Sequence, residues 1–407
     1  MGRAGKSFLA GSVAVGTLMS MAGCGSLSSN VVWHQKELEH ISTSSETVSD
    51  LVEKVAGPSV KSGENVGLVI GVITGEDKAT FAFGKRSRTS DEVPDGDTVF
   101  AIGSITKAFL SLLVHQLVQE GSLSLSDTLE NLLPKDNELS DAAKKITIRQ
   151  LLTHSSGLPR QPNDLQMLVS LINYTLTGEN IYRHIDADKV LEALREFDPD
   201  PEEVGAYRYS NIGSGILGKV IELKTKKPLQ TLLDEKILGR IGAKDTTFHP
   251  TLEQWTRLAT GHVGASPFLV PRNTPMDQWD MGDILTGAAG LYSTANDLLK
   301  FAQYRIALGN PVVDLTPIHH GILSVSSKAT QKSSLGWIIH DFDDYATHIT
   351  FMNGMISGYS AYIGVDPQRK LGVVVLANNF DWDDHIGHNL LLALARKQMA
   401  QQVQSGD

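Results

Sequence analysis

The chain has 407 residues, of which 41% are hydrophobic and 20% are charged, a composition that is ordinary for a folded globular protein. Its formal net charge is −10 and it has no cluster of basic residues, which argues against a nucleic-acid-binding protein. The length allows two or three average domains, or one large enzyme built of two interleaved lobes.

The first residues of the chain differ from the rest. Arg3 and Lys6 precede an apolar stretch, 8–21, which is short for a membrane-spanning helix and typical of a secretory signal peptide. Small residues then lead to Cys24, the only cysteine of the chain, in an arrangement that resembles a bacterial lipobox. We therefore expect residues 1–23 to be a lipoprotein signal peptide and Cys24 to carry lipid. A plain signal peptide followed by an incidental cysteine is the alternative.

The segment after Cys24 is rich in Ser and Thr, and we expect residues 24–45 to form a tether ahead of a folded domain at 46–402. Several acyl chains on one cysteine would anchor the protein stably, because each buried CH₂ contributes about 0.8 kcal/mol. The expected location is therefore outside the cytoplasm, on a bacterial membrane and facing the periplasm.

Hydrophobic spacing predicts the elements of the folded domain. A first helix begins near Ser45, and two short strands at 66–72 and 80–83 flank a hairpin turn. Helices are predicted at 107–121, 146–153, 164–175, 187–196, 211–224, 228–239 and 295–307. Strands are predicted at 335–340, 348–352, 360–365 and 371–377, before a closing helix at 385–402. Strands at both chain ends with helices between them predict an α+β fold, in which one antiparallel sheet is flanked by helices and a mostly helical lobe is inserted.

Ser104 and Lys107 are the first candidates for chemistry. They lie three residues apart at the start of a predicted helix, so their side chains share one face. A serine hydroxyl is a weak nucleophile until a base takes its proton. A lysine can be that base only if burial or a nearby cation lowers its pKa. Alone, the pair also fits a helix-capping serine and a solvated lysine.

Tyr209 and Asn211 form the second candidate group, at the end of a loop and before a predicted helix. A phenol near Ser104 and Lys107 can relay a proton to a leaving group, and an amide can orient the lysine and a substrate carbonyl. A core tyrosine beside a helix-capping asparagine is the alternative interpretation.

The third candidate is the segment 352–359, between two predicted strands. Gly354 and Gly358 permit close approach of the backbone. A strand edge beside the nucleophile can offer its amides to an oxyanion and to an extended substrate.

In this order, the three groups resemble the Ser-x-x-Lys, Tyr-x-Asn and Lys/His-x-Gly motifs of class C β-lactamases, DD-peptidases and related esterases. The segments 148–159, 287–297, 335–337 and 372–378 agree with the same family, and the likeness covers residues 46–400. The resemblance implies a β-lactamase/transpeptidase-like fold.

The resemblance also implies roles for individual residues. Ser104 would be the acyl-enzyme nucleophile, Lys107 its proton partner and Tyr209 an acid/base; which of the last two is the acylation base is open. Asn211 would orient the substrate. The segment formed by Asn353, Gly354 and Met355 would bind it, with the amides of Ser104 and Met355 as the oxyanion hole.

One position departs from the family pattern. Met352 stands where the family has Lys or His, and His348 is too far along the strand to replace it. The segment 381–384 is acidic where class C enzymes have polar and basic residues. We therefore expect weak acylation by carboxylate-bearing β-lactams, and better turnover of neutral or cationic esters and amides.

The sequence thus predicts an exported, lipid-anchored serine hydrolase that acts on amides or esters, such as small cell-wall peptides or β-lactams, without a cofactor. A carboxylesterase and a catalytically weak binding lipoprotein are the alternatives. His154 is expected to be structural. His385 and His388 are expected to belong to a solvated helix start and not to a metal site. A small-molecule or peptide substrate and a membrane are the expected partners, and nucleic acid is not.

Overall fold

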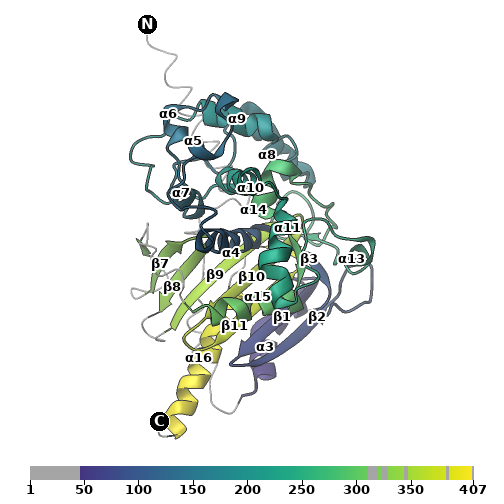
Figure 1. Cartoon of the computed structure of the whole chain (residues 1–407). Coiled ribbons are helices and arrows are strands. Elements are labelled where there is room, and N and C mark those ends of the chain that lie inside the picture. The colour runs from purple at the N-terminus through teal and green to yellow at the C-terminus, as the bar shows by residue number, and fades with distance from the viewer. Residues whose placement is uncertain (1–45, 310–319, 323–328, 343–346, 382–384, 406–407) are drawn as a thin grey trace.

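The chain is described by a computed structural model over residues 46–309, 320–322, 329–342, 347–381 and 385–405. An antiparallel sheet of eight described strands runs through the lower half of the molecule (Figure 1). The strands follow the order β2 (Asp77–Gly84), β1 (Gly67–Thr74), β11 (Leu371–Ala377), β10 (Tyr359–Asp366), β9 (Thr347–Ile356), β8 (Trp337–Phe342), β7 (Ala329–Ser334) and β6 (His320–Ile322). Because β1 pairs with β11, the sheet joins the two ends of the domain, as the sequence predicts.

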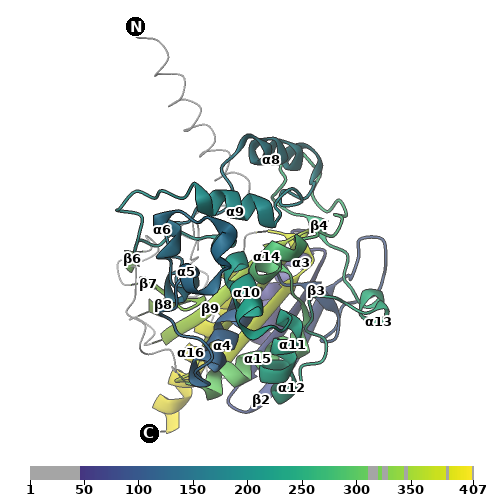
Figure 2. The ribbon, with the colours of Figure 1, turned by 45° about the horizontal axis from the view of Figure 1, so that its top comes forward.

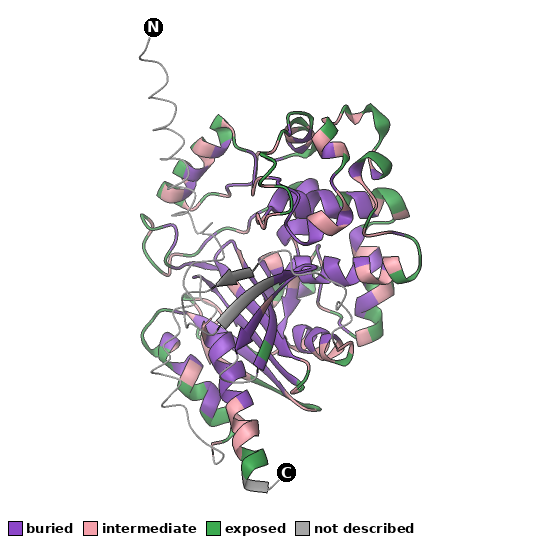
Figure 3. Cartoon of the chain, turned by 90° about the vertical axis from the view of Figure 1, so that its left-hand side faces the viewer, coloured by how far each residue is buried: buried purple, intermediate pink, exposed green. Residues whose placement is uncertain are grey.

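The two faces of the sheet carry separate apolar cores, because successive side chains of a strand point to opposite faces. On β1, Val69 and Ile73 belong to the same apolar core as α4 (Thr106–Gln119) and α15 (Ala295–Ala307). On the opposite face, Leu68, Ile70 and Val72 share a second core with α3 (Val48–Lys61) and α16 (His385–Ser405). Figure 3 shows that buried residues fill the sheet and the helices on it, while exposed ones gather on the outer helices and at the C-terminal end of α16.

A mostly helical lobe lies above the sheet in Figures 1 and 2. It contains α5 (Leu129–Leu132), α6 (Asp141–Lys144), α7 (Ile148–Leu152), α8 (Leu165–Thr177), α9 (Ala187–Arg195), α10 (Asn211–Thr225) and α14 (Gly282–Ala289). Shorter elements complete the fold: α11 (Leu229–Leu233), α12 (Gly239–Ile241), α13 (Leu252–Thr256), β3 (Val99–Ala101) with β5 (Tyr292–Thr294), and β4 (His262–Val263) with β12 (Asn379–Phe380).

The helices α10 and α14 pack closely because small residues face each other. A Cβ on Gly215 would lie 2.3 Å from the carbonyl oxygen of Ile284, and one on Gly218 would lie 3.3 Å from the Cα of Gly287. This contact places the C-terminal end of α14 beside the start of α4. It therefore positions a backbone carbonyl for the site described below.

The predicted fold class is confirmed, with several differences in the elements. The sequence did not predict α14, the sheet strands β6 and β7, or short elements such as α5, α6, α13 and β5. The strand predicted at 348–352 continues to Ile356, and the helix predicted at 228–239 is divided by a π-turn at Asp234–Leu238. Within the described ranges, no helix combines the length and apolar character that a membrane-spanning segment requires. The predicted signal peptide, Cys24 and the tether lie outside the described residues.

Candidate active site

Ser104 lies in one turn of 3₁₀ helix, Gly103–Ile105, between β3 and α4, and its side chain is partly exposed. Gly103 has a φ of 50°, and a Cβ there would lie 2.8 Å from the backbone nitrogen of Met355. The turn can therefore pack this closely against β9 only with glycine at position 103. The sequence analysis placed Ser104 at the start of the helix, and the structure places it one turn earlier.

Lys107, in the first turn of α4, is 3% exposed. Its Nζ lies 2.9 Å from Ser104 Oγ, 3.0 Å from Asn211 Oδ1 and 2.7 Å from the carbonyl oxygen of Ala288. Burial, helped by the charge of Arg160, holds the pKa of Lys107 well below its ordinary value. Lys107 therefore loses its proton far more readily than a surface lysine does.

The three contacts of Lys107 also suit its neutral form. A neutral amine keeps two N–H donors and gains a lone pair. Two of its hydrogens can point at Asn211 and Ala288, which offer only oxygen acceptors there. The lone pair then faces the Ser104 hydroxyl, and this arrangement can accept the serine proton.

Tyr209 reaches Ser104 from the other side. Its hydroxyl donates to Ser104 Oγ at 2.7 Å. Lys107 Nζ and Arg160 Cζ each lie 4.9 Å from the centre of its ring, and the His154 ring lies 4.5 Å from it. The nucleophile therefore has a base on one side and a hydroxyl donor on the other, near the positive charge of Arg160.

The segment around Tyr209 is fixed by hydrogen bonds to the loop after α7. Ser210, the N-cap of α10, accepts from Gly213 N and donates to the Pro159 carbonyl at 2.7 Å. The backbone N–H of Ser210 donates to Nδ1 of His154 at 3.2 Å. Burial, with nearby positive charge, lowers the pKa of His154 to about 3, so this ring is neutral and can accept. His154 has the structural role that the sequence predicts, as a support for Tyr209.

Asn211 is the first residue of α10 and is 5% exposed. While its Oδ1 contacts Lys107, its Nδ2 donates to the hydroxyl of Tyr182 at 3.1 Å. The amide is thus held in one orientation, with its oxygen toward the lysine.

The segment of Asn353, Gly354 and Met355 forms the end of β9 beside Ser104. A Cβ on Gly354 would lie 2.0 Å from the carbonyl oxygen of Ile102 and 2.8 Å from the backbone nitrogen of Ser104. Asn353 is buried and Met355 is partly exposed. The structure therefore brings the backbone nitrogens of Ser104 and Met355 to one place, where they can serve one oxyanion.

Met352, which stands where the family motif has Lys or His, is 3% exposed and belongs to the apolar core. The positive charge near the site comes instead from Arg160, on the loop after α7, which lies over Tyr209. The sequence analysis missed Arg160, which directly follows the segment 148–159 that resembles the family.

The acidic segment 381–384 could repel a substrate carboxylate only from the mouth of the pocket, and its first residue, Asp381, is buried instead. Asp381 is 7% exposed, forms an ion pair with Arg272 and accepts from the backbone N–H of Ala265 at 2.6 Å. The carboxylate of Asp381 therefore joins β12 to the loop after β4. Residues 382–384 lie outside the described residues.

The remaining histidines considered in the sequence analysis lie away from Ser104. Nδ1 of His348 lies 2.6 Å from a carboxylate oxygen of Asp341. His388, on α16, is buried against His340 of β8 and is not solvated as expected. Among the described residues, no group of three His, Cys, Asp or Glu side chains is placed to bind a metal ion.

Comparison with known proteins gives one family. The family model Beta-lactamase matches residues 51–397. The D-alanyl-D-alanine-carboxypeptidase/endopeptidase AmpH of Escherichia coli K12 is 25% identical over 349 residues, covering 82% of this chain and 85% of that protein. Protein flp of Staphylococcus aureus MW2 is 27% identical over 286 residues, which are 69% of this chain and 53% of that protein.

Solved structures share the fold. A class C beta lactamase from Rhodobacter sphaeroides has a TM-score of 0.67 at 22% identity, and the match covers 86% of this chain and all of that one. The octameric penicillin-binding protein homologue from Pyrococcus abyssi has a TM-score of 0.68 at 23% identity, covering 89% of this chain and 78% of that one.

Proposed function

Since the chain belongs to the beta-lactamase family and is a serine hydrolase, we propose that it hydrolyses amides or esters through an acyl-enzyme on Ser104. The single observation that carries this proposal is the position of Ser104 Oγ between Lys107 Nζ at 2.9 Å and the Tyr209 hydroxyl at 2.7 Å.

In the proposed acylation, Lys107 takes the proton of the Ser104 hydroxyl as the serine oxygen attacks the substrate carbonyl. The amides of Ser104 and Met355 stabilise the oxyanion. When the intermediate collapses, the bond to the leaving group breaks and Tyr209 gives that group a proton. In deacylation, water gives a proton to Tyr209 and attacks the acyl carbonyl; the bond to Ser104 Oγ then breaks, and Lys107 returns the proton to the serine oxygen. Burial of Lys107 supports its role as the base, because only its neutral form can accept a proton.

We assign recognition of a carboxylate on the leaving group to Arg160. This guanidinium lies over the ring of the residue that would protonate the leaving group, whereas Met352 has no charge to offer. Small cell-wall peptides are the leading substrate class, because AmpH, with which the chain aligns over most of its length, is a D-alanyl-D-alanine-carboxypeptidase/endopeptidase by name. β-Lactams would enter the site as mimics of such peptides.

A carboxylesterase is the second candidate, because Met352 removes the cation of the third motif. A binding lipoprotein without catalysis is a third, and the intact set of Ser104, Lys107, Tyr209 and Asn211 argues against it.

Three probes separate these candidates: a fluorescent penicillin, a fluorophosphonate and a p-nitrophenyl ester. A peptidase of this type reacts with all three probes, and an esterase reacts with the last two only. A binding protein reacts with none, and that result would overturn the proposal.

We also propose that the protein is exported and lipid-anchored through Cys24, on the basis of the charged start, the apolar stretch and the single cysteine. Labelling with a fatty acid in the native host should mark the wild type and spare Cys24→Ser. Equal labelling of both forms, or secretion of both forms free and unlabelled, would contradict the anchor. The unlabelled, secreted outcome would leave the export argument standing.

A further inference from the structure

A cavity of about 450 Å³ opens beyond the end of β9. Ile356 and Ser357, which follow Met355, form one wall, and Ala289 and Gly290, which follow the carbonyl that contacts Lys107, form another. Two walls of the cavity are therefore formed by residues that directly follow parts of the candidate active site in the chain. Neither Tyr209 nor Arg160 lines it.

A substrate that lies along β9 with its carbonyl at the amides of Ser104 and Met355 has two arms. The leaving-group arm lies toward Tyr209, whose hydroxyl contacts Ser104 Oγ and would give that group its proton. The other points past Ile356 into the cavity. The cavity thus lies on the side of the acyl group, the part that stays bound to Ser104 after the first step.

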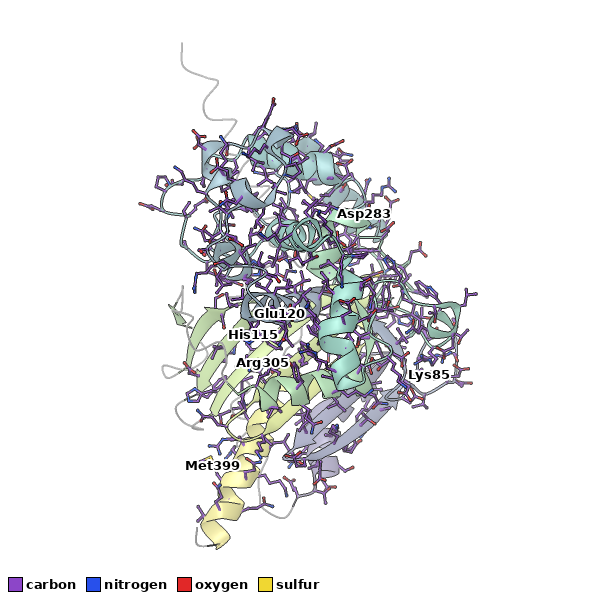
Figure 4. All side chains as sticks on the ribbon, viewed as in Figure 1. Lys85, His115, Glu120, Asp283, Arg305 and Met399 are labelled. Carbon is purple, nitrogen blue, oxygen red and sulfur yellow. The ribbon has the colours of Figure 1, made fainter. Side chains whose placement is uncertain are left out.

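The walls of the cavity carry negative charge and aromatic surface. Asp280 and Asp283 line it from the start of α14, and both are exposed; Asp283 is labelled in Figure 4. Trp255 and Tyr292 line it from the other side with their rings 5.7 Å apart, and the Trp255 side chain is 41% exposed.

The described residues that line the cavity include no Lys or Arg, and His249 is the one basic side chain among them. Burial, and after it the charge of Asp280, raise the pKa of Tyr292 to about 12. Carboxylates that line a cavity together with aromatic rings form an environment that stabilises an ammonium group.

Building on the proposed function, we propose that this cavity selects substrates whose acyl group carries an ammonium or quaternary ammonium, with Asp280, Asp283 and Trp255 as the residues that determine this specificity. The acyl end of the site is then selective for cations, while the leaving-group end, at Arg160, is selective for anions.

The test uses two p-nitrophenyl esters that differ in charge alone. One is the ester of γ-trimethylammoniobutyrate, and the other has a tert-butyl group in place of the trimethylammonium. Rates are corrected for the hydroxide-catalysed reaction of each ester. Wild-type protein should favour the cationic ester in kcat/KM by about tenfold at low ionic strength, and less in high salt.

Asp280→Asn with Asp283→Asn should bring this preference close to one, and Trp255→Leu should reduce it about threefold. Asp277→Asn is the matched control, because Asp277 is exposed on the same loop and does not line the cavity. It should leave the preference unchanged.

Equal turnover of the two esters by the wild type, or a preference that survives the double substitution, would overturn the cation selectivity and leave the proposed function intact. Turnover of both esters that persists in Ser104→Ala would instead overturn the proposed function, and the selectivity with it.

Discussion

The sheet separates two buried polar clusters, and both contain a base whose pKa is lowered by burial. On the face toward the helical lobe, Lys107 contacts three oxygens, one of them on the partly exposed Ser104. On the face toward α16, His340 lies against His388 with their nitrogens 3.0 Å apart, and their exposed fractions are 1% and 0%. Burial lowers the pKa of His340 to about 3.

The difference between the clusters lies in what surrounds each base. The rings of Phe351 and Tyr362 pack on the histidine pair. Lys107, by contrast, lies beside a hydroxyl that solvent can reach and a phenol that donates to it. A base with a lowered pKa therefore indicates an active site only where a nucleophile and a path for the substrate accompany it.

The largest expected effect is at Lys107. Lys107→Met keeps most of the buried volume but removes the base, and it should lower kcat/KM for a p-nitrophenyl ester by about a thousandfold or more. Lys144→Met, at a partly exposed lysine of α6, is the control and should have no effect. A loss of less than about tenfold, with folding unchanged by circular dichroism, would place the base elsewhere.

The next effect concerns Tyr209 and depends on the leaving group. Tyr209→Phe removes the proton donor, which an amide nitrogen needs and p-nitrophenolate does not. Turnover of an anilide should fall by about a hundredfold or more, and that of the matched p-nitrophenyl ester much less. Equal losses on the two substrates, measured as kcat, would mean that the tyrosine acts on the attack of Ser104 and not on the leaving group.

Arg160 should have a smaller and more selective effect. A hydrogen bond to a charged group contributes about 1.5–3 kcal/mol, so Arg160→Gln should lower kcat/KM by about ten- to a hundredfold for a peptide whose leaving group carries a carboxylate. For the matched peptide in which an amide replaces this carboxylate, the same substitution should change kcat/KM little. If both peptides lose activity equally, the arginine supports Tyr209 and does not bind the carboxylate.

The histidine cluster should change stability and not catalysis. The pKa of His340 is about 3 in the folded protein, against an ordinary value of 6.5, so the unfolded chain binds its proton first as the pH falls. Stability should therefore be unaffected by His340 above about pH 6.5 and should fall by about 1.4 kcal/mol for each pH unit below it, down to about pH 3.

The variant His340→Leu with His388→Leu replaces both partners by apolar side chains. It should flatten this pH dependence in urea unfolding and keep ester turnover at neutral pH. A loss of turnover in this variant would show that the two faces of the sheet are coupled.

The sequence was sufficient for the parts of the site that form local motifs. Each of two pairs, Ser104 with Lys107 and Tyr209 with Asn211, lies within one turn of chain. The spacing of each pair therefore indicates its chemistry without the structure. Ala288 could not be predicted, because it contributes a backbone carbonyl and leaves no signal in its side chain. Its helix, α14, contains Gly287 and packs through it on α10, so tertiary contact rather than helix propensity determines it.

Two other features depended on contacts between distant segments. The strand prediction stopped at 352, because Asn353 and Gly354 have low β propensity, yet pairing with β10 continues through Met355 and Ile356. Arg160 belongs to no motif, and only the folded loop brings its charge to Tyr209. The fold class and the nucleophile thus follow from the sequence, whereas the charge pattern around the nucleophile requires the structure.

The most direct test of the mechanism is the site of covalent modification. The protein is treated with a fluorophosphonate, its intact mass is measured, and the modified peptide is identified after digestion. The proposed acyl-enzyme predicts one adduct, on Ser104, that is absent in Ser104→Ala and forms far more slowly in Lys107→Met. An adduct of unchanged mass and rate in Ser104→Ala would contradict the mechanism.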